Sequence, residues 1–88
     1  MNPGASRYEL FVDGELTGFL DYRLGDGTIA LTHAEVEPDR RGLGFGMALA
    51  AGAIADAAER ELKVIPRCPF VVAYVARHPE LAPLLAGR

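Results

Sequence analysis

The sequence lacks several features that would assign a protein to a whole class at once. It has one cysteine, Cys68, so no disulfide can form within the chain. Its first residues lack the apolar segment of a signal peptide. Its longest apolar run, residues 42–58, is interrupted by Asp56 and is too short to span a membrane. These absences favour a cytoplasmic protein.

Positive charge is also scarce. Nine lysines and arginines stand against twelve aspartates and glutamates, so the formal net charge is −3. The strongly basic surface of a nucleic-acid-binding protein is therefore not expected. The 88 residues, half of them hydrophobic, suit one small domain. We expect a flexible tail over residues 1–6 and a single domain over residues 7–88.

Alternating apolar residues and short turn signals predict three antiparallel strands. Asp13 and Gly14 form a strong hairpin signal between the first two, and glycines at residues 25 and 27 mark the next turn. We expect strands at residues 7–12, 16–24 and 28–36. One face of the second strand should carry Leu16, Gly18, Leu20, Tyr22 and Leu24.

The second half of the chain predicts two helices separated by a short strand. The first helix should run from Gly46 to about Glu61, with small side chains on the face that packs against the sheet. A strand at residues 62–65 follows. Pro69 suits the first turn of a second helix, residues 70–78. The predicted fold is α+β (mixed α/β), a three-strand meander followed by helix, strand and helix.

The loop before the first helix, DRRGLGFG (residues 39–46), has the composition of an anion-binding site. The N-terminus of a helix presents backbone N–H groups without partners, and glycines let a ligand approach the backbone closely. Arg40 and Arg41 add positive charge. We expect a phosphate or pyrophosphate here. The plainer interpretation is a glycine-rich turn that lets the helix pack tightly.

The glycine spacing excludes two common phosphate-binding patterns. The loop contains no lysine, which the P-loop of nucleoside triphosphatases requires. Counting from Gly42 or from Gly44 places Met47 or Leu49 where a dinucleotide-binding loop needs its third glycine. What remains is arginine at 41 and glycine at 44 and 46, after a strand that ends at Val36.

This spacing resembles the pyrophosphate-binding signature of the GNAT superfamily of N-acetyltransferases, (Gln/Arg)-x-x-Gly-x-(Gly/Ala). The flanking segments THAEVEPDRRGLGFGMAL and LKVIPRCPFVVAYVARHPEL look like those of a compact, stand-alone subfamily with a Cys-Pro-Phe motif. The resemblance covers roughly residues 8–81. The first helix pair of larger members is missing here.

The resemblance implies a minimal GNAT-like fold that uses acetyl-coenzyme A as co-substrate, with no metal. It implies an amine acceptor, either a small molecule or a protein lysine or N-terminus, with no nucleic-acid or membrane partner. Backbone N–H groups of the loop would hold the pyrophosphate, and the strand edge near Glu35 and Val36 would orient the pantetheine arm. The cofactor-binding residues implied are Val36, Arg41, Gly42, Leu43, Gly44, Phe45 and Gly46. An open sheet edge is compatible with a monomer or a weak dimer.

Two polar residues on the third strand are candidates for the general base. His33 and Glu35 are expected to share a strand face with Ile29 and Leu31, so that the apolar face turns polar at its end. An amine must lose a proton to attack a thioester, and a carboxylate or imidazole can take it. Glu35 is the first choice and His33 the second. The plainer interpretation is a hydrogen-bonded histidine and a solvated carboxylate.

Cys68 precedes Pro69 and should be the N-cap of the second helix, where the helix N-terminus favours a thiolate. Cys68 has three alternative roles: a nucleophile that carries the acetyl group, a proton donor or hydrogen-bond partner near the thioester, or an inert buried cysteine. Tyr74 lies on the same helix, where larger GNAT enzymes often place a tyrosine that protonates the departing thiolate. Its alternative is a packing role in the core.

Two other functions remain compatible with the sequence. One is a non-catalytic module that binds coenzyme A or acyl-coenzyme A through the same loop, with Cys68 structural or redox-active. The other is an interaction domain that binds no coenzyme A at all.

Overall fold

The computed structural model describes residues 6–38 and 44–86. Its elements confirm the predicted order of three strands, helix, strand and helix, and the α+β class. The bounds differ from the predicted ones by at most two residues, and a short 3-10 helix, η2, is added at the end. None of the described helices is long and apolar enough to cross a membrane. The elements are β1 (Arg7–Val12), β2 (Glu15–Leu24), β3 (Thr28–Val36), α1 (Phe45–Glu59), β4 (Lys63–Pro66), α2 (Pro69–Arg77) and η2 (Pro79–Leu84).

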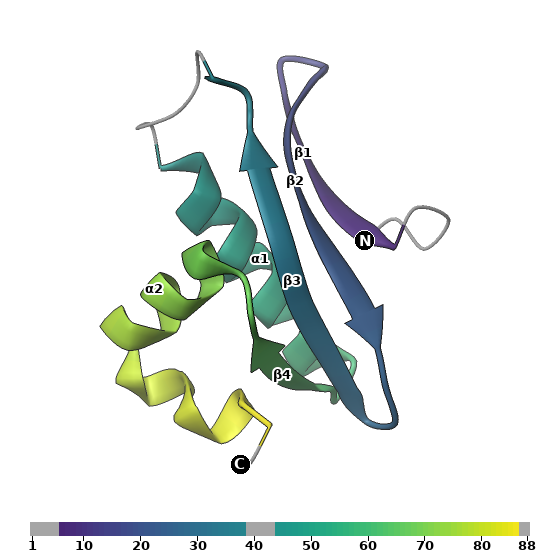
Figure 1. Cartoon of the computed structure of the whole chain (residues 1–88), viewed down its shortest axis with the longest axis vertical. Coiled ribbons are helices and arrows are strands. Elements are labelled where there is room, and N and C mark those ends of the chain that lie inside the picture. Colours follow the sequence, from purple (N-terminus) through teal and green to yellow (C-terminus); the bar gives the residue numbers. More distant parts are fainter. Residues whose placement is uncertain (1–5, 39–43, 87–88) are drawn as a thin grey trace.

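The strands form one sheet in the order β1-β2-β3-β4. The first two pairs are antiparallel, and α1 crosses over to place β4 parallel to β3 (Figure 1). The parallel pairing joins only residues 28–31 of β3 to residues 63–66 of β4. Of the predicted tail, residues 1–5 lie outside the described residues, and the carbonyl of Ser6 accepts a hydrogen bond from the backbone N–H of Tyr22.

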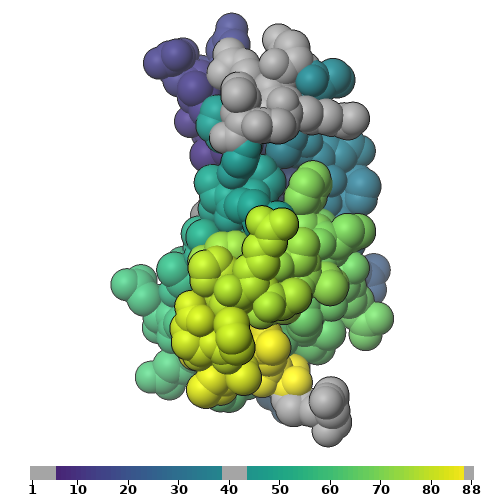
Figure 2. Space-filling model, turned by 90° about the vertical axis from the view of Figure 1, so that its left-hand side faces the viewer, coloured from purple at the N-terminus to yellow at the C-terminus, as the bar shows by residue number. Residues whose placement is uncertain are grey.

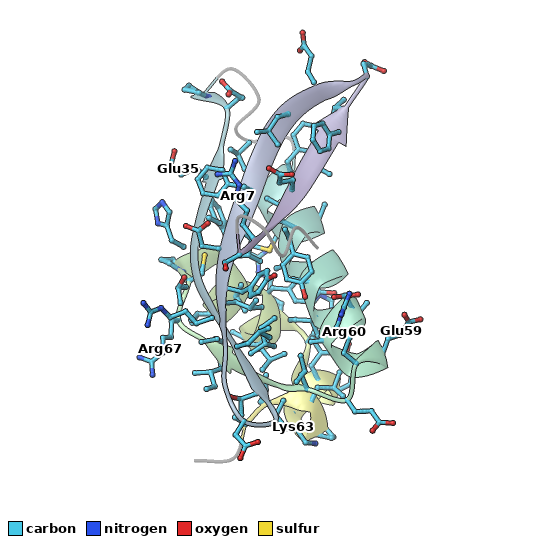
Figure 3. All side chains as sticks on the ribbon, turned by 90° about the vertical axis from the view of Figure 1, so that its right-hand side faces the viewer. Arg7, Glu35, Glu59, Arg60, Lys63 and Arg67 are labelled. Atoms are coloured by element: carbon cyan, nitrogen blue, oxygen red, sulfur yellow. The ribbon has the colours of Figure 1, made fainter. Side chains whose placement is uncertain are left out.

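One hydrophobic core joins the sheet to both helices, and side chains fill the space between them (Figure 3). The sheet contributes large side chains such as Leu20 and Ile29, which are fully buried. Helix α1 contributes small ones, including the buried Ala50 and Ala57. Small residues let the helix axis lie close to the sheet, as the sequence predicts.

A bulge in β2 changes which of its side chains face the core. Leu10 pairs with Gly18 but Phe11 pairs with Leu16, so Thr17 is an extra residue on β2. The prediction that Leu16 shares a face with Gly18 is therefore wrong. Leu16 lies beside Phe11 instead, and the two side chains are 38% and 58% exposed.

A second bulge, in β3, has a larger consequence. Tyr22 pairs with Leu31 whereas Asp21 pairs with His33, so Thr32 is the extra residue. Because strand side chains alternate, one inserted residue moves every later side chain to the other face. The prediction that His33 and Glu35 share a face with Ile29 and Leu31 is therefore wrong. Ala34 and Val36 continue the core face, and His33 and Glu35 are exposed.

The edge strand β1 is tied to α1 by a hydrogen-bonded carboxylate. The Tyr8 hydroxyl donates to Oδ2 of Asp56 at 2.8 Å, and Nε of Arg60 donates to the same oxygen at 2.8 Å. Burial raises the pKa of Asp56, but the hydrogen bonds from Tyr8 and Arg60 lower it by more, so it lies below its usual value. Burial and the bond to Asp56 raise the pKa of the Tyr8 phenol.

The lowered pKa of Asp56 makes the fold sensitive to acid. Such a group stabilises the fold fully above its unfolded pKa of about 3.9, and the contribution is lost as pH falls through the lower folded value. We expect the difference in free energy of unfolding between wild type and Asp56→Asn to be constant above about pH 5 and to shrink below about pH 4. Urea titrations from pH 7 to pH 2.5 measure it. Glu59→Gln, an exposed change on the same helix, is the control and should differ from wild type by less than about 0.5 kcal/mol throughout.

Gly18 is required by the close approach of β3. A methyl carbon on Gly18 would lie 2.9 Å from the backbone oxygen of Glu35 and 3.2 Å from Cδ1 of Leu49. We expect Gly18→Ala to destabilise the protein by about 1–3 kcal/mol, because backbone must move to accept the methyl group. In contrast, a methyl carbon on Gly52, in α1, meets nothing within 4 Å. Gly52→Ala should be neutral or stabilise by up to about 1 kcal/mol. Equal effects in thermal melts would contradict this account.

Candidate functional site

The described part of the glycine loop is the start of α1. The predicted cofactor-binding residues Arg41, Gly42 and Leu43 lie outside the described residues. Gly44 is the N-cap of α1 and has a left-handed backbone, with φ 83° and ψ 8°, which glycine adopts without strain. Its carbonyl accepts the bond from Ala48 N–H at 3.0 Å that opens the helix. The N–H groups of the first turn then point out of the helix end, where an anion can bind them.

Gly46 has a packing role that the motif does not reveal. It is buried, and the Phe70 ring from α2 lies against it. A methyl carbon on Gly46 would come within 2.8 Å of Cδ1 and 2.9 Å of Cε1 of that ring. The last glycine of the loop therefore lets the first turns of α1 and α2 come together.

The sheet opens between β3 and β4 next to these first turns. The carbonyl of Leu31, the last residue of β3 that pairs with β4, accepts hydrogen bonds from Arg67 N–H at 3.0 Å and Cys68 N–H at 2.8 Å. The chain then turns into α2, so among the described residues only β2 pairs with the rest of β3, residues 32–36. Figure 2 shows the start of α1, the end of β3 and the start of α2 around one part of the surface.

His33 and Glu35 form a hydrogen-bonded pair on the outer face of β3. His33 Nε2 lies 3.0 Å from Oε2 of Glu35, and the side chains are 57% and 60% exposed. A carboxylate only accepts hydrogen bonds, so Nε2 carries the proton when Glu35 is ionised. The structure brings together the two residues that the sequence predicts as bases, although on the opposite face from the predicted one.

A shallow hollow of about 220 Å³ lies beside Glu35. The Arg7 guanidinium stands 4.6 Å from the centre of the Phe19 ring, and this ring is 6.1 Å from that of His33. Figure 3 shows Arg7 and Glu35 near the same end of the sheet. The hollow is lined by Arg7, Leu16, Thr17, Gly18, Phe19, Glu35, Val36, Glu37 and Pro38.

Cys68 occupies the predicted N-cap of α2, and Pro69 the first helical position. Its thiol makes no capping hydrogen bond and has no exposed surface. It packs in the core cluster with Val71 and Leu31. An acyl group could reach this thiol only after local opening of the structure. The three roles considered for Cys68 remain alternatives.

Tyr74 is half-buried and packs against the core. Its ring stacks on that of His78, with 4.3 Å between centroids, and His78 Nδ1 lies 3.2 Å from Oε2 of Glu80. No hydrogen bond or ring contact within the described residues links Tyr74 to Glu35 or Cys68. Its role in protonating a leaving group remains a prediction. The described residues also contain no group of three histidine, cysteine or acidic side chains placed to hold a metal ion.

The sequence profile of the GCN5-related N-acetyl-transferase family matches residues 7–84. The chain belongs to this family. Among solved structures, the chain is similar in fold to ribosomal-protein-alanine N-acetyltransferase from Brucella melitensis biovar Abortus 2308, at a TM-score of 0.63 and 25% identity. The similarity covers 91% of this chain but 60% of that chain, so this chain spans less than two thirds of its relative. No curated protein matches the chain with statistical significance.

Membership of the GNAT family confirms the predicted fold and the family to which the glycine loop points. It does not test the more specific prediction of a Cys-Pro-Phe subfamily. The Thr32 bulge and the contact between Gly46 and Phe70 were not predicted. No local pattern signals either one, because each depends on a partner that is distant in the sequence.

The burial of Cys68 gives a direct test of its environment. Because it is the one thiol in the chain, a thiol-reactive dye reports on it alone. We expect the native protein to react about a hundredfold or more slower than the urea-unfolded protein, as for an opening that costs about 2.7 kcal/mol. Reaction of the native protein at the unfolded rate would show that the thiol is accessible.

Proposed function

We propose that this protein is an acetyl-coenzyme A-dependent N-acetyltransferase that transfers the acetyl group to a primary amine. The observation that supports the proposal is the open edge of β3, which lies close to an anion-binding helix N-terminus and to a candidate general base. The N-terminus of α1, capped by Gly44, lies at one side, and the His33–Glu35 pair lies on the strand itself. Family membership supports the reaction class.

The donor side of the proposal uses backbone groups. The pyrophosphate of coenzyme A suits the N–H groups at the start of α1, with Arg41 adding charge from outside the described residues. The pantetheine arm contains amides that can hydrogen-bond along a strand edge, and residues 32–35, which among the described residues pair only with β2, offer such an edge on their other side. Under this assignment, the arm would extend from the first turn of α1 to the place where the sheet opens.

The acceptor side of the proposal uses Glu35 as general base. Glu35, directly or through a water molecule, takes a proton from the ammonium group, and the neutral amine nitrogen then attacks the thioester carbonyl. The carbon–sulfur bond breaks, the nitrogen releases its second proton to solvent as the amide forms, and the thiolate takes a proton from solvent or from Tyr74. The His33 N–H holds the Glu35 carboxylate in place. Much of the rate would come from positioning the two substrates together.

The acceptor is best sought among amines that are open to solvent. The hollow beside Glu35 is also lined by Glu37, and these two carboxylates suit an ammonium group on a larger molecule, whereas the Arg7 guanidinium in the same lining stands over the Phe19 ring. The similar Brucella structure is named for the acetylation of a ribosomal protein alanine. A peptide with an N-terminal alanine is therefore the first acceptor to test, followed by a lysine side chain and a small amine.

A non-catalytic coenzyme A-binding module is the second candidate. Two observations favour it: the Cys68 thiol is buried, and Glu35 is 60% exposed, which leaves a general base largely in water. Such a module would be stabilised by acetyl-coenzyme A but would release no free thiol with any amine. An interaction domain would not be stabilised at all.

Glu35→Gln tests the catalytic proposal. We expect kcat to fall about a hundredfold, the lower range for loss of a general base, while the KM for acetyl-coenzyme A stays within about threefold. Release of coenzyme A thiol measures both constants. Glu59→Gln, an exposed change of the same kind on α1 and outside this hollow, is the control and should retain kcat. Full activity of Glu35→Gln would exclude this residue as the base.

Cys68→Ala separates direct transfer from an acetyl-cysteine intermediate. Direct transfer predicts turnover by this variant and no gain in mass of the wild type when acetyl-coenzyme A is added without an amine. Because Cys68 is buried, we expect a loss of stability of about 1–3 kcal/mol, so activity is compared at a temperature where both proteins are folded. A mass gain that disappears in Cys68→Ala would support the covalent route.

A further inference from the structure

Phe70 is an aromatic residue whose position the core does not explain. It lies in the first turn of α2 and its surface is 38% exposed, whereas Val71 beside it is fully buried. One side of the ring lies against Gly46 in the first turn of α1. The exposed remainder is apolar surface that a ligand can cover.

The Phe70 ring joins the first turn of α2 to the first turn of α1. Hydrogen bonds from Arg67 and Cys68 to the Leu31 carbonyl fix the start of α2 at the point where β3 loses its parallel partner. Gly46 lies in the first turn of α1, next to the expected pyrophosphate site. A ligand that extends from the α1 N-terminus to the open edge of β3 therefore passes the first turn of α2 (Figure 2).

We propose that Phe70, held against Gly46, forms an apolar wall for the pantetheine arm of coenzyme A, and that Gly46 acts as a positioning residue through Phe70. The proposal rests on the proposed function. The methylene groups and paired methyl groups of the arm are apolar and suit an aromatic ring.

This role gives a reason for glycine at position 46. The family signature accepts glycine or alanine there, but in this chain the added methyl carbon would come within 2.8 Å of Cδ1, 2.9 Å of Cε1 and 3.1 Å of Cγ of Phe70. The ring is not enclosed, so it can move outward rather than destabilise the core. Alanine at 46 would thus displace the ring from its place against α1.

A double-mutant cycle with coenzyme A as the probe tests the proposal. We expect Gly46→Ala and Phe70→Ala each to raise the Kd of coenzyme A about tenfold. In the Phe70→Ala background, Gly46→Ala should have no further effect, because the group that it displaces is gone. Phe70→Leu should restore part of the affinity. With acetyl-coenzyme A, Phe70→Ala should raise KM with little change in kcat, a result that loss of folded protein would not give.

Two variants serve as controls. Val72→Ala removes an apolar side chain from α2 that is 47% exposed, and Gly52→Ala adds a methyl group to α1 in open space. Both should leave the Kd of coenzyme A unchanged. All titrations are made below the melting temperature of the least stable variant.

Three outcomes would overturn the proposal. An unchanged Kd in Phe70→Ala would show that the ring is not a wall. An equal effect of Gly46→Ala with and without Phe70 would show that Gly46 acts independently of the ring. Failure of the wild type to bind coenzyme A would remove the proposed function and this inference together, whereas binding without turnover would remove only the catalytic proposal.

Discussion

The arrangement of the site depends on the carbonyl of Leu31. It accepts backbone hydrogen bonds from both Arg67 and Cys68, at the last residue where β3 and β4 pair. Because these bonds turn the chain into α2, β4 does not continue alongside β3, and within the described part of the chain residues 32–35 pair with β2 alone. One acceptor thus ends a strand, fixes the start of a helix and opens the sheet next to the first turn of α1.

The bulge at Thr32 immediately follows Leu31. The end of pairing at Leu31 opens the strand edge, and the bulge determines which side chains lie on the outer face. The bulge places His33 and Glu35 on the outer face and Val36 in the core. Under the proposed function, the donor lies along the strand edge and the acceptor approaches from the outer face. Neither substrate then needs to enter the core. This arrangement suits a domain of 88 residues, which has few residues available to enclose a buried site.

The sequence predicts the elements well because their signals are local. Alternation, the Asp13–Gly14 turn and Pro69 at the start of α2 each act within a few residues. The predicted assignment of side chains to strand faces is partly wrong, because a bulge depends on the register with a neighbouring strand, which the sequence of one strand does not contain. His33 and Glu35 were still predicted as a pair, since residues two apart share a face whichever face that is. The packing role of Gly46 depends on its contact with Phe70, and no local sequence pattern predicts a contact between residues so far apart in the chain.

The exposure of the His33–Glu35 pair bears on how such a site would accelerate a reaction. With side chains 57% and 60% exposed, charges here are screened by water, so electrostatic stabilisation contributes less than in an enclosed site. Positioning must then supply more of the effect. The packed and hydrogen-bonded features lie where the donor is proposed to bind: Gly44 at the helix start, the Leu31 hydrogen bonds, and Phe70 against Gly46. Under the proposed function, the site positions its donor through these contacts and leaves selection of the amine to the molecule that covers the outer face of β3.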